Sequence, residues 1–153
     1  MLYAQVQADV GDTIKNVAAE VIDEMGIEPL CNKLLGLPEQ IRKLQNQMAE
    51  AQKEVDNVQR AVELEKALIT ADVTSEVNFD GKPVFSNEKT RNAEITRRMA
   101  DDQDYLTAIE ALAKAEEQVS SLRFDIERLN SDMANLRAVV SARAAQVQAL
   151  FGN

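Results

Sequence analysis

The chain has 153 residues, of which 26 are acidic and 17 basic, giving a formal net charge of −9 at pH 7. It has no histidine and a single cysteine, so the commonest general base, cysteine-rich metal sites and an internal disulfide are all excluded. It has no tryptophan, four phenylalanines and two tyrosines, which predicts an aliphatic core. We therefore expect a protein that is not an enzyme and that binds no metal and no cofactor.

The location of the protein is predicted from its hydropathy. No run of about 18 apolar residues is present, and the first residues lack a basic start followed by an apolar stretch. These features predict a cytoplasmic protein without membrane contact. The lone Cys31 has the apolar neighbours Leu30 and Leu34, which favours a buried thiol over a reactive or intermolecular one.

Residues 1–37 form the first predicted segment. Its apolar residues recur at steps of three and four, which is typical of one face of an amphipathic helix: Tyr3, Val6, Val10, Ile14, Val17, Val21 and Met25. Gly26 predicts the end of this helix. A short apolar piece follows, and then Gly36 predicts another helix end while Pro38 suits the first turn of the next helix.

Residues 38–71 are predicted to form the first coiled-coil helix. One apolar row recurs every seven residues: Ile41, Met48, Val55, Val62 and Ile69. A second row, Leu44, Ala51 and Val58, runs beside it until Glu65 and Asp72 interrupt it.

Residues 105–153 carry the longest sevenfold pattern and are predicted to form one coiled-coil helix. Its first row is Tyr105, Leu112, Val119, Ile126, Met133, Val140 and Val147. Its second row is Ala108, Ala115, Leu122, Leu129, Leu136, Arg143 and Leu150. Together these rows predict a seam, either within a helical hairpin or between copies of the chain.

The two coiled-coil helices are expected to pair as a long antiparallel hairpin in an all-α fold. At 1.5 Å per residue, the C-terminal rows span roughly 68 Å and the first helix about 42 Å, which leaves a surplus of roughly 25 Å. Two covers for this surplus remain open. The N-terminal segment could lie beside Val140, Val147 and Leu150, or a second copy of the chain could pack there in a homo-oligomer.

Residues 72–104 form an insertion between the two long helices. Asp80-Gly81 predicts a β-hairpin in which both turn residues have positive φ, and apolar residues flank it: Val77, Phe79, Val84 and Phe85. Pro83 limits any strand to a short edge strand.

A short helix is predicted after this hairpin, from Asn87 to about Ala100, with Ser86 as its N-cap. The acidic residues Asp101, Asp102 and Asp104 lie where the long C-terminal helix begins. We interpret them as capping and dipole-stabilising residues, because a calcium loop would need a different spacing.

The insertion is the basic part of an acidic chain. Residues 82–98 carry two acidic and five basic side chains: Lys82, Lys89, Arg91, Arg97 and Arg98. Such cations could contact a nucleic-acid backbone while Phe79 or Phe85 stacks on bases. The alternative is a solvated helix face on which these cations pair with Glu88, Glu94 and the acids after Ala100. The overall negative charge opposes strong binding of nucleic acid by a monomer.

A resemblance to known proteins rests on the run from Asn78 to Asn87, then Arg91, then Ala100-Asp101-Asp102 with Tyr105, and finally Leu122, Ile126 and Leu129. These residues resemble small coiled-coil proteins carried by phages and related mobile elements. The layout is similar to that of phage recombination-mediator proteins, which assemble into rings and help load a recombinase onto single-stranded DNA. Two features differ from that layout: the net negative charge of the whole chain, and residues 1–37, which the layout does not include.

This resemblance implies the host-cell cytoplasm, an oligomer, and DNA-backbone contacts from the five cations of the insertion. A second likeness is to prefoldin-type chaperone subunits, which are helical hairpins with strands in the connection. Their helix ends hold clients by apolar contact.

Three hypotheses for the function follow. The leading one is a non-enzymatic coiled-coil adaptor that self-associates and binds a protein or single-stranded DNA through the insertion. The second is a structural, chaperone-like or host-inhibitory protein that acts by protein contact. The third is an enzyme that depends on carboxylates such as Asp101 and Asp102.

Overall fold

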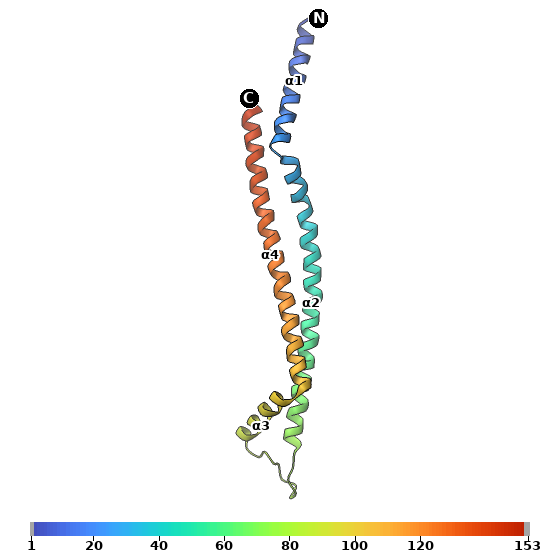
Figure 1. Ribbon diagram of the computed structural model, residues 1–153, viewed down its shortest axis with the longest axis vertical. Helices are drawn as coiled ribbons and strands as arrows, with labels where there is room; N and C mark the ends of the chain where they lie inside the picture. Colours follow the sequence, from blue (N-terminus) through green and yellow to red (C-terminus); the bar gives the residue numbers. More distant parts are fainter. Residues whose placement is uncertain (1, 152–153) are drawn as a thin grey trace. The chain divides into compact units, whose positions relative to one another are not determined.

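The computed structural model describes residues 2–151, and it describes the side chains of all of these except residues 2–11, 22 and 151. Four helices follow one another, and Figure 1 shows them in sequence colours. They are α1 (Leu2–Glu24), α2 (Ile27–Ser75), α3 (Glu88–Asp101) and α4 (Gln103–Phe151). Within residues 2–151 no strand is formed, only one isolated bridge. The predicted all-α class is confirmed.

The chain divides into two compact units, and both α2 and α4 contribute to each of them. Unit 1 comprises Met1–Leu44 and Asp125–Asn153, whereas unit 2 comprises Gln45–Phe124. Unit 2 contains the insertion, and unit 1 contains α1.

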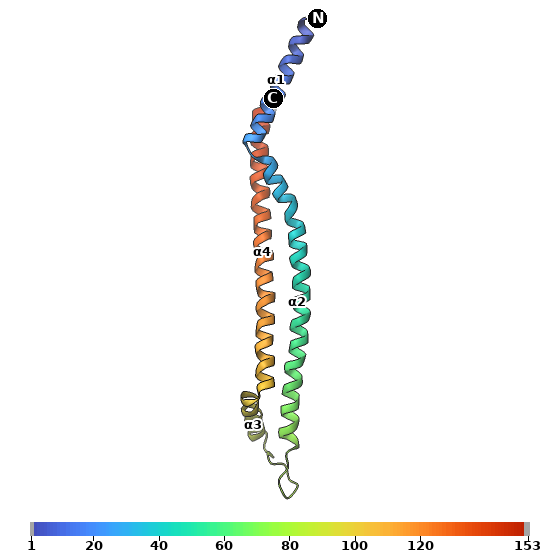
Figure 2. The same cartoon turned by 45° about the vertical axis from the view of Figure 1, so that its right-hand side comes forward.

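The core of unit 2 lies between the parts of α2 and α4 that belong to this unit, residues 45–75 and 103–124 (Figures 1 and 2). Ala51 and Val55 of α2 form one buried cluster with Ala115 and Val119 of α4. Three partly buried residues pack against this cluster: Met48, Leu112 and Leu122. Because two of the four buried residues are alanines, the two helix backbones can approach closely here.

Buried apolar residues continue to the end of α2, but their spacing changes from seven residues to four. Val62 and Ile69 are buried seven residues apart, and Val73 follows four residues later. Val73 is only 1% exposed, the lowest value among the described core residues, whereas Asp72 is exposed. A step of four residues stays on the same helix face, so Val73 takes the place that Asp72 would have in a strict sevenfold repeat. Val73 was not among the residues predicted for the apolar rows.

The predicted rows of α4 match the exposure of its side chains. From Tyr105 to Val147, every residue of both rows is buried or half-buried. Apart from Asp125, all other described residues of α4 in that range are exposed. Leu150, the last residue of the second row, is also exposed.

In unit 1 the predicted end of the first helix is confirmed, since α1 ends at Glu24 and Gly26 follows with a φ of +58°. The guanidinium of Arg143 donates a hydrogen bond to the carbonyl oxygen of Met25. A helix end leaves carbonyl groups without partners and carries partial negative charge, so a cation is favourable there. This contact gives a physical reason for the one charged residue in the rows of α4.

The predicted helix boundary at Gly36 and Pro38 is wrong, because α2 continues through both residues. Proline cannot donate a hydrogen bond to the residue four positions earlier, which destabilises a helix interior. Leu37 and Ile41 on either side of Pro38 are both buried, and their packing offsets this loss. Figure 2 shows α2 curving in its N-terminal part.

Because α2 begins at Ile27, earlier than predicted, α2 and α4 both have 49 residues. Of the three residues expected beneath the N-terminal segment or a second copy, Val140 and Val147 are half-buried and Leu150 is exposed. The apolar face predicted for Tyr3, Val6 and Val10 lies outside the described side chains. Cys31 is half-buried rather than fully buried.

Candidate functional site

The candidate site is the turn segment, residues 76–87, together with α3. At its centre Asn78 closes a tight turn, in which the Gly81 amide donates to the Asn78 carbonyl at 2.9 Å and the Asn78 amide donates to the Lys82 carbonyl at 2.8 Å. The Asn78 side-chain oxygen also accepts hydrogen bonds of 3.0 Å from the amides of Asp80 and Lys82. Four hydrogen bonds therefore fix the backbone of residues 78–82.

This turn differs from the predicted two-residue type. Gly81 has a φ of +73°, whereas no residue other than glycine has positive φ in the described chain, so Asp80 does not. The loop is a three-residue one that ends in a left-handed glycine, the next most common way to reverse the chain. Only one isolated bridge, Val77 with Pro83, accompanies it, because proline cannot extend a hydrogen-bonded ladder.

Phe79 projects from this fixed turn without covering contacts. Its relative exposure is 111%, above that of the reference extended residue. Val77 and Val84 are exposed on either side of it, whereas Phe85 is half-buried. We call Val77, Phe79 and Val84 the apolar turn patch. An exposed aromatic side chain on a fixed backbone is typical of a contact surface, since little backbone entropy is lost when it binds.

The start of α3 is set by polar contacts. Asn87, and not the predicted Ser86, is the N-cap, and its side-chain oxygen accepts a 2.8 Å hydrogen bond from the Lys89 amide. Asparagine caps helices at least as well as serine, so the sequence alone did not distinguish the two. Arg91 donates from Nε and Nη2 to the Phe85 carbonyl, at 3.4 and 3.3 Å. The guanidinium of Arg91 thus ties α3 to the turn segment.

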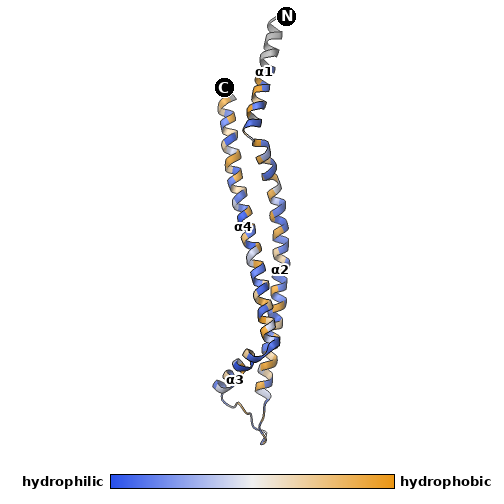
Figure 3. Cartoon of the chain, viewed as in Figure 1, coloured by the Kyte–Doolittle hydropathy of each residue, from blue (hydrophilic) through white to orange (hydrophobic). Residues whose placement is uncertain are grey.

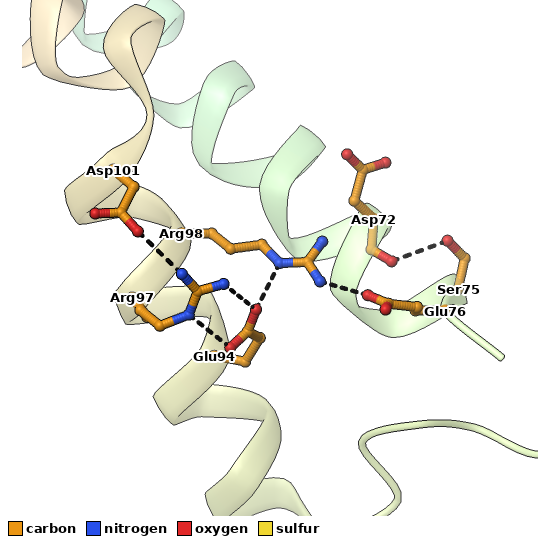
Figure 4. A network of polar contacts seen from close by, with 7 residues as sticks. All are labelled: Asp72, Ser75, Glu76, Glu94, Arg97, Arg98 and Asp101. Atoms are coloured by element: carbon orange, nitrogen blue, oxygen red, sulfur yellow. Dashed lines mark hydrogen bonds and ion pairs between the residues drawn. The ribbon is translucent and has the colours of Figure 1, made fainter. Parts of the chain in front are cut away.

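The predicted binding residues Arg97 and Arg98 are engaged within the molecule (Figure 4). Arg97 donates two hydrogen bonds to Glu94, at 3.0 and 2.7 Å, and a third to Asp101 at 3.0 Å. Arg98 bonds Glu94 at 2.8 Å and also pairs with Glu76, which directly follows α2. Two cations therefore meet three carboxylates.

This network has a clear electrostatic signature at Glu94, whose side chain is only 15% exposed. Hydrogen bonds from Arg97, and then from Arg98, lower the pKa of Glu94 from 4.5 to about 2. The same contacts raise the pKa of both guanidinium groups. The arrangement matches the alternative interpretation of the sequence, in which these cations pair with nearby acids.

Lys82 and Lys89 are the remaining cations of the predicted site. Both are exposed, and in the described part of the chain neither ammonium group forms an ion pair. With the charge of Arg97 and Arg98 compensated, the structure leaves Lys82, Lys89 and Arg91 as the cations able to contact a ligand.

In the acidic cluster before α4, Asp102 has the predicted capping role. The Asp102 carboxylate accepts a 2.8 Å hydrogen bond from the amide of Tyr105, in the first turn of α4. Asp101 is bound to Arg97. Among the described residues, no group of three or more His, Cys, Asp or Glu side chains is placed to hold a metal ion.

Sequence reasoning did not assign Asn78 or Glu76 to the site, and it placed Val77 and Val84 in a β-hairpin rather than on an exposed surface. Asparagine is favoured at the first position of such turns, so Asn78 could have been identified from that preference. No local sequence pattern indicates the role of Glu76, because its partner Arg98 is 22 residues away.

Two further findings bear on function. No helix in the described range has a stretch that is apolar and long enough to cross a bilayer. In comparisons with known proteins, no family model, curated protein or solved structure matches this chain.

Proposed function

We propose that the chain is a non-enzymatic adaptor in which α2 and α4 form an antiparallel coiled-coil hairpin that presents the turn segment to a protein partner. The exposure of Phe79 on a turn fixed by four hydrogen bonds carries this proposal. Aromatic anchors that enter a pocket of the partner dominate the binding energy of many protein interfaces. Val77 and Val84 add apolar contact around the anchor.

A protein partner is favoured over nucleic acid by the charges of the site. The ion-pair network of Arg97 and Arg98 contains two cations and three carboxylates, so its sum is −1. Contacts to phosphates need uncompensated cations, and residues 76–101 as a whole carry five acidic and five basic side chains, so the site has no net positive charge. The three side chains of the apolar turn patch, in contrast, are exposed and available to contact an apolar pocket.

The test compares two exposed phenylalanines in the full-length chain. Tagged wild-type protein, Phe79→Ala and Phe124→Ala are used to recover partners from the extract of a host cell, with quantitative mass spectrometry. Phe124 is 66% exposed on α4, outside the turn segment. We expect one partner to be retained by wild type and Phe124→Ala and lost at least tenfold with Phe79→Ala. Equal recovery by all three proteins contradicts the proposal.

Single-stranded DNA is the second candidate ligand, because Lys82 and Lys89 form no ion pair with the side chains that the structure describes and Phe79 is exposed and could stack on a base. This candidate would agree with the resemblance to phage recombination mediators. Fluorescence anisotropy with labelled oligothymidine over a salt series tests it. Replacing both lysines by Ala should then reduce the salt slope by about 1.4, since each phosphate contact on a single strand contributes about 0.7, whereas Lys53→Ala should not reduce it. Binding that is absent or unaffected by the double substitution removes DNA from the account.

A further inference from the structure

Helices α3 and α4 are separated by a single residue, Asp102, whose backbone is extended, with a φ of −83° and a ψ of 117°. Neither glycine nor proline occurs between Glu88 and Phe151, so no residue in this stretch forces a break. A break leaves the last carbonyls of one helix and the first amides of the next without intrahelical partners. Other contacts must therefore stabilise the break at Asp102.

The contacts at this break are polar. The Asp102 carboxylate accepts the hydrogen bond from the Tyr105 amide, and the Asp102 carbonyl accepts one of 3.1 Å from the Leu106 amide. Arg98 holds α3 to the end of α2 through Glu76, and α3 itself has no buried residue. Single caps and partly exposed ion pairs each contribute modestly to stability, so the break depends on a few weak contacts.

The sevenfold rows of α4 continue backwards through α3, but with charged residues. Counted back in sevens from residues 105 and 108, the rows reach four side chains: Arg98, Arg91, Asp101 and Glu94. All of these except Asp101 are half-buried. A helix that ran unbroken from α3 into α4 would therefore place charged residues at row positions, where they need charged partners.

Asp72 of α2 is placed to be such a partner for Arg98. Val55 and Ala115 share one buried cluster, and Asp72 follows Val55 by 17 residues while Arg98 precedes Ala115 by 17. In the antiparallel hairpin proposed above, Asp72 would lie level with Arg98 of an unbroken helix. Asp72 is exposed, and its carboxylate has no hydrogen bond or ion pair within the described range (Figure 4). Both residues line the same open pocket beside the junction of α3 and α4.

We propose that Asp102 is a hinge between two states of unit 2. In the bent state, which the structure shows, Arg98 pairs with Glu76. In the joined state Asp102 is helical, α3 continues into α4, and Arg98 pairs with Asp72, one helical turn before Glu76. Shifts by one helical turn are a known form of two-state transition. The proposal also gives a reason for the acidic residue that interrupts the second apolar row of α2.

The hinge would regulate how the turn segment is presented. Arg91 ties α3 to the Phe85 carbonyl, so a movement of α3 carries the turn segment with it. Phe79 would then have a different position relative to α2 in the joined state. This consequence rests on the proposed function, whereas the hinge itself does not.

NMR relaxation dispersion at the Asp102 Cα carbon tests the hinge in the full-length chain without a partner. It detects exchange on the microsecond-to-millisecond timescale, and it gives the population and the chemical shift of the minor state. We expect a minor state with a helical shift. Glu76→Gln removes the acceptor of the bent state and should raise the ratio of joined to bent molecules about threefold, the effect of one exposed ion pair. Glu63→Gln, at an exposed position of α2 away from the junction, should leave the ratio unchanged.

A second variant identifies the acceptor of Arg98 in the joined state. Adding Asp72→Asn to Glu76→Gln should return the ratio towards that of wild type, because the joined state then loses its own ion pair. Absence of exchange at Asp102 in every variant, or a minor state without a helical shift, overturns the proposal. A gain that Asp72→Asn does not reverse also contradicts it. None of these results bears on partner binding by Phe79, which the recovery experiment with Phe79→Ala decides separately.

Discussion

Two neighbouring regions of unit 2 are held by different forces. The paired helices α2 and α4 bury Val55, Ile69, Val73 and Val119. Helix α3 has no buried residue and is placed by its N-cap, by Arg91 and by the ion pair between Arg98 and Glu76. Figure 3 shows this contrast, because hydrophobic colours recur along α2 and α4 while α3 is largely hydrophilic. Apolar packing therefore fixes the frame, and polar contacts fix the surface that it presents.

The largest expected effect tests the packed region. Ile69→Ala removes a buried side chain and should lower the free energy of unfolding by about 2–4 kcal/mol. Its neighbour Leu68 is 53% exposed, so Leu68→Ala should change the free energy by less than about 0.5 kcal/mol. Urea unfolding followed by circular dichroism measures both. Equal losses for the two variants would mean that Ile69 does not face the core.

A second substitution tests whether packing overrides local sequence in α2. Because Pro38 lies inside a continuous helix, Pro38→Ala should raise the free energy of unfolding by about 1–2 kcal/mol. If a helix instead began at Pro38, proline would suit its first turn and the substitution would bring no gain. Pro83→Ala, outside the helices, provides the control. Urea unfolding distinguishes the two outcomes.

The N-cap of α3 should matter only locally. Asn87→Ala removes the acceptor of the Lys89 amide and should destabilise α3 by about 1 kcal/mol. Amide exchange in residues 88–101 should become faster, while exchange in the core of unit 2 stays unchanged. Asn87→Asp retains a capping carboxylate and should behave like wild type. A loss of global stability with Asn87→Ala would contradict the local role of the cap.

Protonation of Glu94 in acid should weaken the ion-pair network that holds α3. Its pKa is lowered to about 2 in the folded protein from an ordinary value of 4.5, so its contribution is complete above pH 4.5 and is lost as the pH falls through about 2. Carbon-detected NMR of the Glu94 carboxyl group measures this titration. Arg97→Gln should raise the pKa of Glu94, because it removes the larger of the two stabilising contacts. A Glu94 pKa near 4.5 in the wild type would show that the network does not form.

The prediction from sequence was most accurate where apolar residues recur at regular spacing along a helix. The rows of α4 were predicted from apolar spacing alone, because burial on one side of a long helix imposes that spacing at every turn. The end of α1 at Gly26 was predicted because a left-handed residue there favours glycine.

The failures have two physical origins. Gly36 and Pro38 were interpreted by local preference, but the packing of Leu37 outweighs that preference. The ion pair between Arg98 and Glu76 joins residues that are distant in sequence, so no local pattern could reveal it. The five cations of the insertion are visible in the sequence, but which of them pair with Glu94 depends on rotamers that a sequence does not specify.

Native-state hydrogen exchange of the full-length chain tests the contrast between the two regions most directly. Amides of α2 and α4 around Val55 and Val119 should exchange only through global unfolding, whereas amides of α3 should exchange at least a hundredfold faster through local opening. Exchange of α3 at the same slow rate as the core of unit 2 would contradict the account, because it would show that α3 is packed as firmly as the helices beside it.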